Sequence, residues 1–299
     1  MPLFIPLTVK KAIKGVLGRM GYSVSRLEKL KPKNMDMYFQ IYGKNDVLQK
    51  KFYNIGSGTF RHPAWTNIDY KSDWYAENEI DINYNLLDCK PLPLHDSIAN
   101  AFYSSHTIEH ITDEAAQNMF NEIYRVLKKG GYLRLVAPNI DLSYKTIKNN
   151  DRYFWQEDID IYSKKENMDR VGIAIPMNQV SIKQLFLYSF ASQTSMLHID
   201  PNTNKITDQE FDSLFEHNSY QATLDLIKSK CKLELQSKYP GNHINWWNQD
   251  KIFRMLKIAG FSEVYLSGYR QSFCPVMRDT SSFDNSHPEL AIFVETIKV

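Results

Sequence analysis

The stretch "KKFYNIGSGTFRHPAWTNIDY" (residues 50–70) contains two β-prone runs separated by a glycine-containing turn. The first run ends at Gly56-Ser57-Gly58, where residues without side chains let the chain turn sharply and let a ligand approach the backbone. The second run closes on an acid, Asp69, and in dinucleotide-binding folds an acid at this place accepts hydrogen bonds from ribose hydroxyls. A G-x-G turn alone is weak evidence for a ligand-binding site, because many pairs of glycines in loops bind no ligand.

The following segments repeat this alternation. "EIDINYNLLD" reads as a third strand closing on Asp88, which could accept a hydrogen bond from an exocyclic amine such as that of adenine. "NAFYSSH" reads as a fourth strand, and a helix is expected from about Asp113 to Lys128, with acids in its first turn and Gly130-Gly131 after its end. "YLRLVAP" reads as a fifth strand. Strands alternating with helices predict an α/β fold with a parallel sheet and a ligand site at the carboxyl ends of its strands.

Taken in order, these features resemble the class I S-adenosylmethionine-dependent methyltransferases. The resemblance rests on "NIGSG…WTNIDY…LLDCKPLPLHDSIANAFYSSHTIEHI…EIYRVLKKGGYLRLVAPNID" over residues 51–141 and resumes with "MLKIAGFSEVYL" at 255–266. It implies a Rossmann-like, seven-stranded, mostly parallel sheet whose last two strands form a hairpin. "EVYLSGY" and "ELAIFVETI" are the candidates for that hairpin, and a helical insertion precedes them. The implied cofactor is S-adenosyl-L-methionine.

The resemblance also implies a set of cofactor-binding residues at the ends of the first four strands. They are Gly56, Ser57 and Gly58 at the methionine end, Asp69 at the ribose, Leu87 and Asp88 at the adenine, and Ser104, Ser105 and His106 beside the sulfonium. One segment departs from the family pattern, because only "TFRHPAW" separates Gly58 from Thr66. A parallel crossover normally takes a dozen or more residues, and Pro63 would break a helix, so the first helix is expected to be shortened or lost. The cofactor carboxylate could then be held by Arg61 or by the amino-terminal region.

The stretch "SSHTIEHIT" (residues 104–112) also fits the H-x-x-E-H pattern of inverted zinc proteases. Such a pair needs both histidines on one helix, whereas the helix signals here begin only at Thr112. We therefore expect an irregular turn after the fourth strand and no metal site. Methylation of a hydroxyl needs a base, and His106 is the first candidate because it follows the fourth strand.

Other residues could also supply this base. The further candidates are His110 and Asp141, then Glu109, with His198 or His243 arriving from the insertion. For the later histidines, the alternative is a hydrogen-bonded structural role. Glu109 or His110 could simply brace the loop.

The methyltransferase pattern stops between Asp141 and Asn242. We expect a basic amino-terminal segment over 1–47, a cofactor-binding core over 48–141 plus 242–299, and a mainly helical, acceptor-binding insertion over 142–241. Ser181 with Gln184, and Thr207 with Glu210, are expected to cap two of its helices. The insertion is rich in aromatic residues, which either bind a polyhydroxylated acceptor such as a sugar or form its own core. They are Tyr144, Tyr153, Phe154, Trp155, Tyr162 and Tyr188.

Composition limits the remaining possibilities. A net charge of +2 argues against nucleic acid as a partner, and three cysteines without a C-x-x-C pair fit a reduced, cytoplasmic protein. Residues 1–35 carry eight Lys or Arg against one acid, Glu28, with apolar residues at helical spacing. This segment is either an amphipathic helix in peripheral contact with the inner face of the membrane or a helix packed on its own domain.

The expected function is O-methylation of a small-molecule or glycan acceptor, of the carbohydrate or sugar-nucleotide type, in surface-polysaccharide synthesis. The alternatives are an N- or lipid methyltransferase at the membrane, and a methyltransferase-like binding protein without catalysis.

Overall fold

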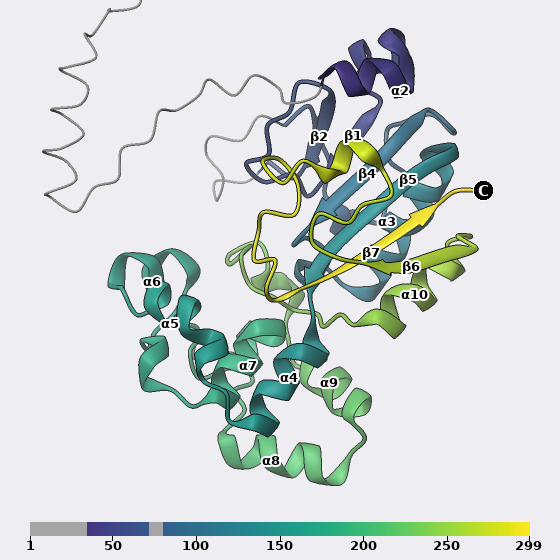
Figure 1. Cartoon of the computed structure of the whole chain (residues 1–299). Helices are drawn as coiled ribbons and strands as arrows, with labels where there is room; N and C mark the ends of the chain where they lie inside the picture. The colour runs from purple at the N-terminus through teal and green to yellow at the C-terminus, as the bar shows by residue number, and fades with distance from the viewer. Residues whose placement is uncertain (1–34, 72–79) are drawn as a thin grey trace, which may run out of the picture. The chain divides into compact units, whose positions relative to one another are not determined.

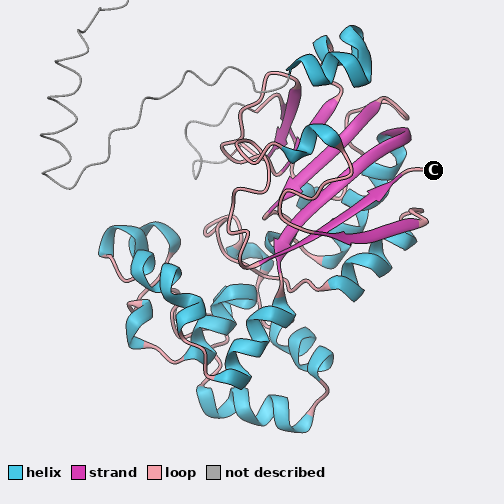
Figure 2. Ribbon diagram, viewed as in Figure 1, coloured by secondary structure: helices cyan, strands magenta, loops and turns pink. Residues whose placement is uncertain are grey.

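A seven-stranded sheet organises the core (Figures 1 and 2). The computed structural model describes residues 35–71 and 80–299, and its strand order is β3-β2-β1-β4-β5-β7-β6. The strands are β1 Phe52–Ile55, β2 Trp65–Asp69, β3 Ile82–Asn83, β4 Ala99–Ser105, β5 Leu127–Pro138, β6 Glu263–Ser267 and β7 Ala291–Ile297. β1 to β5 pair in parallel, whereas β7 is antiparallel to both of its neighbours, β5 and β6. The predicted α/β fold and carboxyl-terminal hairpin are confirmed.

Helix α3 (Asp113–Val126) packs against the sheet and against α10 (Gln249–Ile258). Thr112 caps α3 by accepting from the Ala115 amide, and its buried stripe includes Met119, Phe120 and Ile123. The helix ends two residues before the expected Lys128, since Leu127 already pairs with Ala99 of β4. Strand pairing therefore takes the residues that local helix signals had assigned to the last turn.

The connection from β1 to β2 contains no helix in residues 56–64, so the expected loss of the first helix is confirmed. Aromatic side chains from other segments cover this part of the sheet instead. In α2 (Met35–Leu48), the Tyr38 hydroxyl accepts a hydrogen bond of 2.7 Å from Trp65 Nε1, and the Tyr38 ring meets Phe52 edge-on. From the segment between β6 and β7, Phe283 packs 5.1 Å from the Trp65 ring.

A buried arginine fixes the segment between β6 and β7. Arg134 of β5 is fully buried and donates through Nε and Nη2 to Asp284, at 2.9 and 2.6 Å. Its Nη1 lies 3.0 Å from Glu295 of β7. Since Asp284 comes from the loop and Glu295 from the last strand, one guanidinium ties both to the middle of the sheet.

The insertion begins just after β5 and is helical, as expected (Figure 1). Its helices are α4 Ile140–Asn149, α5 Gln156–Tyr162, α6 Lys165–Val171, α7 Ile182–Ala191, α8 Asp208–His217 and α9 Tyr220–Lys228. Ser181 caps α7, and Thr207 with Glu210 forms a reciprocal capping box at α8.

These helices enclose a second hydrophobic core. Of the aromatic residues expected to face an acceptor, Trp155 is buried in this core, and Tyr144, Phe154, Tyr162 and Tyr188 pack against it. Tyr153 is 86% exposed. For five of the six aromatic residues, the alternative of an internal packing role is therefore the one observed.

Sheet and insertion belong to one compact unit, Asp36–Val299. The predicted amphipathic helix within residues 1–35 lies outside the described residues, apart from Met35 at the start of α2. Across residues 35–71 and 80–299, no helix combines the length and the apolar character needed to cross a membrane.

Candidate functional site

A cavity of about 260 Å³ lies where β1 and β2 end and where the chain leaves β4. Six residues expected at the site line it: Gly56, Gly58, Asp69, Leu87, His106 and His110. The insertion also contributes Leu233, Gln236, Ser237 and Pro240. These four residues carry no recognisable motif, and only the fold brings them to the core.

The glycine turn after β1 has a backbone that disfavours side chains. Gly56 has φ +66°, and a Cβ at this position would lie 2.2 Å from Oγ1 of Thr107. Gly58 has φ +50°, but a Cβ there would meet no described atom within 4 Å. Gly56 is therefore required by the contact with Thr107, whereas Gly58 leaves open space at the cavity. Ser57, between them, is buried and does not appear among the described residues that line the cavity.

Asp69 ends β2 with both carboxylate oxygens engaged by backbone amides. Oδ2 accepts from the Gly58 amide and Oδ1 from the Tyr70 amide, both at 2.7 Å. Burial raises the pKa of Asp69, and these amide hydrogen bonds oppose that rise. A carboxylate has about four acceptor positions. Two remain for further donors such as ribose hydroxyls.

The second predicted acid, Asp88, lies elsewhere than expected. β3 ends at Asn83, and Asp88 belongs to a 3-10 helix, Leu86–Asp88, because the Asn85 side chain caps that turn by accepting from the Leu87 amide. The expectation that Asp88 closes the third strand is therefore wrong. Its carboxylate accepts from Asn85 and Lys90. Asn85, Leu86 and Leu87, rather than Asp88, are found among the described residues of the cavity wall.

The two serines before His106 also lie off the cavity wall formed by the described residues. Ser104 is buried within β4, and the Ser105 hydroxyl is buried at the end of that strand. His106 itself has φ +50° and reaches the cavity. The expected irregular turn is confirmed, since Ile108–His110 is a 3-10 helix and α3 begins only at Asp113.

His106 is held at both ring nitrogens. Nδ1 lies 3.2 Å from Oε1 of Glu109, and Nε2 lies 3.0 Å from the carbonyl oxygen of Ser286. Burial lowers the pKa of His106, but Glu109 and the Ser286 carbonyl raise it by more, so its pKa is above the ordinary value. Burial raises the pKa of Glu109, and His106 outweighs this, so its pKa is well below the usual range.

The remaining candidate bases divide into two groups. His110 lines the cavity and lies beside His243, with ring centroids 4.7 Å apart. Burial, followed by His110, lowers the pKa of His243 to about 4. His198 is buried, and its Nε2 lies 2.7 Å from the Asn242 amide oxygen, which is the structural role that was left open.

Asp141 lies in the first turn of α4, away from the described residues of the cavity wall. Its carboxylate accepts from the Tyr220 hydroxyl at 2.9 Å and from the Asn248 amide at 3.2 Å. Asp141 therefore connects α4 to α9 and to the start of α10. This arrangement brings together His106 and His110 but not the third predicted base.

Comparisons with known proteins identify a methyltransferase domain in part of the chain. A methyltransferase-domain family model matches residues 63–135. Similar solved structures include an S-adenosylmethionine-dependent methyltransferase from Thermotoga maritima, described as a possible histamine N-methyltransferase (14% identity, 88% of this chain and 94% of that chain, TM-score 0.36). Others are methyltransferases from Mesorhizobium loti (12% identity, 82% and 90%, TM-score 0.34) and Archaeoglobus fulgidus (10% identity, 88% and 98%, TM-score 0.36). Likenesses this distant say nothing about the reaction. A search of the curated proteins finds no match.

The matched segment contains Asp69, His106 and α3, and it lies in a sheet with the strand order and hairpin implied by the family resemblance. The matched methyltransferase domain, together with this sheet, supports a class I S-adenosylmethionine-dependent methyltransferase. S-adenosyl-L-methionine is the cofactor that this family resemblance implies.

Proposed function

We propose that this enzyme transfers the methyl group to a hydroxyl of a carbohydrate-type acceptor, such as a sugar nucleotide, in surface-polysaccharide synthesis. The observation that carries the choice of oxygen is the position of His106, which lies on the cavity wall with the buried Glu109 carboxylate 3.2 Å behind it. An amine that is already neutral needs no base before attack, whereas a hydroxyl must lose a proton during the transfer.

The cavity offers groups that suit the cofactor. Asp69 has acceptor positions left for the ribose, and Gly58 presents backbone without a side chain. Leu86 and Leu87 supply an apolar wall for a base. From the insertion, Gln236 donates its amide to the Asn242 carbonyl at 2.8 Å, while its own Oε1 is buried with no hydrogen-bond partner among the described residues. An unpartnered acceptor at this wall suits the exocyclic amine of adenine.

Bound S-adenosylmethionine supplies an electrophilic methyl group and its own leaving group. The chain must align the acceptor oxygen and take up its proton. Glu109 at Nδ1 of His106 fixes the ring and stabilises its positive charge after proton uptake. In this structure Nε2 of His106 faces the Ser286 carbonyl oxygen at 3.0 Å and donates to it, so this contact must open before Nε2 can accept the proton of an acceptor hydroxyl.

The acceptor class is supported by the polar rim that the insertion provides. Ser237, an exposed residue of the insertion, brings a hydroxyl group to the cavity wall. Groups of this kind suit a polyhydroxylated molecule, because each can exchange hydrogen bonds with a sugar hydroxyl. The aromatic residues of the insertion lend no support to this choice, since five of them pack with its core.

Calorimetry and methyl-transfer assays test the proposal on the full chain. We expect wild type to bind S-adenosylmethionine and S-adenosylhomocysteine, Asp69→Ala to lose both, and His106→Ala to keep binding but lose turnover. His217→Ala is the matched control, because His217 is an exposed histidine of α8. Sugar nucleotides, amines and phosphatidylethanolamine vesicles are then compared as acceptors. Transfer to nitrogen only, or unchanged turnover in His106→Ala, would contradict the proposal.

A further inference from the structure

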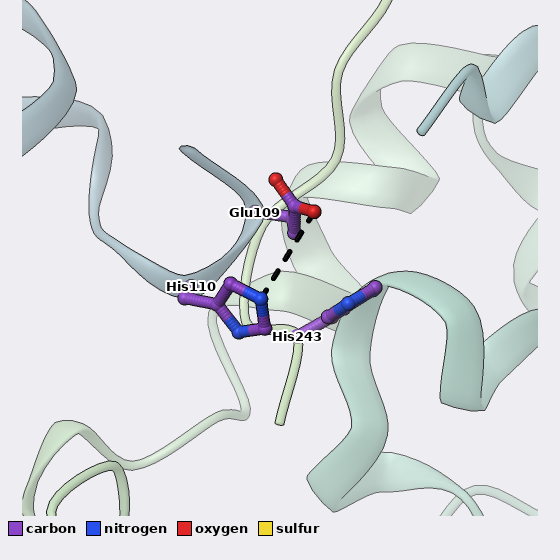
Figure 3. Close-up of side chains that lie close together, drawn as sticks. All are labelled: Glu109, His110 and His243. Atoms are coloured by element: carbon purple, nitrogen blue, oxygen red, sulfur yellow. Dashed lines mark ion pairs between the residues drawn. The ribbon is translucent and has the colours of Figure 1, made fainter. Parts of the chain in front are cut away.

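Three side chains beside the cofactor cavity form a group with the chemistry of a metal site (Figure 3). Glu109 and His110 come from the 3-10 turn after β4, and His243 comes from the segment that returns from the insertion. One carboxylate oxygen and one nitrogen from each ring all lie within 4.8 Å of one another. The zinc-protease pattern pairs His106 with His110, whereas in this set His243 takes the place of His106.

Both histidines are oriented as metal ligands are. Nδ1 of His110 lies 3.0 Å from the Asn242 carbonyl oxygen, and Nδ1 of His243 lies 2.6 Å from the Ser189 carbonyl oxygen. A carbonyl only accepts, so in the neutral rings Nδ1 carries the proton and Nε2 keeps its lone pair. A backbone carbonyl that fixes the tautomer in this way is a recurrent outer-shell partner of metal-bound histidine.

Glu109 supplies a second, independent observation. Its side chain is 1% exposed, and among the described residues its carboxylate oxygens have no partner other than the neighbouring histidines. His106 lies 3.2 Å away as an ion-pair partner, and Nε2 of His110 lies 4.0 Å away. Buried carboxylates normally have their acceptor positions filled or coordinate a metal. Glu109 therefore has coordination capacity directed at the two imidazoles.

We propose that Glu109, His110 and His243 bind one divalent transition-metal ion of the zinc class. Two neutral imidazoles and one carboxylate match the nitrogen and oxygen preference of such ions, and three protein ligands leave a coordination position open. Ligand atoms about 2.1 Å from a tetrahedral ion lie roughly 3.4 Å apart. The observed 4.0 Å between Glu109 and His110 closes to this value by a small side-chain rotation.

The site has a consequence for catalysis, and this consequence rests on the proposed function. His110 belongs both to this cluster and to the cavity wall. An ion held there would lie beside the acceptor, where it could bind a hydroxyl oxygen and make its proton more acidic. His106, next to Glu109, would remain placed to take that proton.

The test is metal binding by the chelator-treated full-length protein, with neither cofactor nor acceptor present. Titration with Zn²⁺ is expected to give one bound equivalent, and X-ray absorption should show nitrogen and oxygen neighbours without sulfur. His243→Ala and Glu109→Gln should each weaken binding at least about tenfold. His217→Ala, at an exposed histidine, should bind as wild type does.

The wild-type measurements keep the proposal falsifiable even if a variant fails to fold. Absence of Zn²⁺ binding by wild type, sulfur ligation from a cysteine, or equal affinity in a folded His243→Ala variant would each overturn it. Failure to bind S-adenosylmethionine would instead contradict the cofactor site and leave the metal result standing. The two proposals can therefore fail separately.

Discussion

Replacing Gly56 by alanine tests the geometry of the cofactor turn most directly. The new Cβ would lie 2.2 Å from Oγ1, 2.3 Å from Cγ2 and 2.8 Å from Cβ of Thr107. Thr107 has little freedom to move away, because a β-branched side chain is stiff at χ1 and its Oγ1 lies 3.2 Å from the Ser105 carbonyl oxygen. The turn or the start of the 3-10 helix must therefore shift.

The cost has two parts. Alanine in a left-handed backbone conformation costs about 1–2 kcal/mol, and Gly56 has φ +66°. Forcing a methyl group into a packed site costs a further 1–3 kcal/mol, roughly. We expect Gly56→Ala to lower the free energy of unfolding by about 2–5 kcal/mol.

Gly58→Ala is the matched control, since Gly58 also has a positive φ (+50°) but no described atom within 4 Å of an added Cβ. We expect it to cost only about 1–2 kcal/mol, yet to weaken S-adenosylmethionine binding, because its methyl group enters the cavity. Urea denaturation followed by circular dichroism gives the first quantity and calorimetry the second. Thr107→Ala in the Gly56→Ala background should recover part of the loss. Equal destabilisation by both alanines, with no recovery, would refute the reasoning.

Three further predictions concern single side chains. Burial raises the pKa of Asp46, but hydrogen bonds led by the one from Lys128 outweigh this effect, so its pKa is about 2 instead of the ordinary 3.8. Asp46 thus stabilises the fold above about pH 4 and loses this contribution as the pH falls toward 2. Asp46→Asn should lower the free energy of unfolding by about 2 kcal/mol near pH 7 in urea denaturation, with a difference that shrinks toward pH 3; a pH-independent difference would contradict the assignment. Arg134→Met should cost about 3–5 kcal/mol by the same measurement, because it leaves Asp284 buried without its cation; a cost below about 1 kcal/mol would count against this. Asp69→Asn replaces one acceptor oxygen by an amide group and so loses one of the two backbone hydrogen bonds, and it also removes the charge that strengthens hydrogen bonds to the ribose; it should bind S-adenosylmethionine at least about tenfold more weakly in calorimetry, and unchanged affinity would reject that role.

Much of the core could be predicted because its signals are local. Strands were recognisable from short β-prone runs that end at glycine or an acid, and α3 from its capped start and apolar stripe. The hairpin followed from the family order. The prediction that Asp88 ends the third strand was wrong because two local structures compete for residues 84–88. The Asn85 side chain stabilises a 3-10 turn there instead of an extended strand.

The parts that could not be predicted depend on residues far apart in the chain. His243 reaches Glu109 only because the segment after the insertion returns alongside the 3-10 turn that follows β4, with the Ile244 amide donating to the Glu109 carbonyl at 2.8 Å. Gln236 reaches the cavity through the same return. No local pattern marks Gln236, and His243 was expected only as a possible base, without its partners Glu109 and His110.

The missing first helix connects the fold to the way the cofactor is held. A helix beginning after Gly58 would direct free amides and a positive dipole end at an anionic ligand. Residues 59–64 form no helix, and the Gly58 amide donates to Asp69 instead. Asp69 thus has two tasks, because it closes the turn around Gly58 and also retains acceptor positions for the ribose. Cofactor binding should therefore depend more strongly on this carboxylate than it would in a turn completed by a helix.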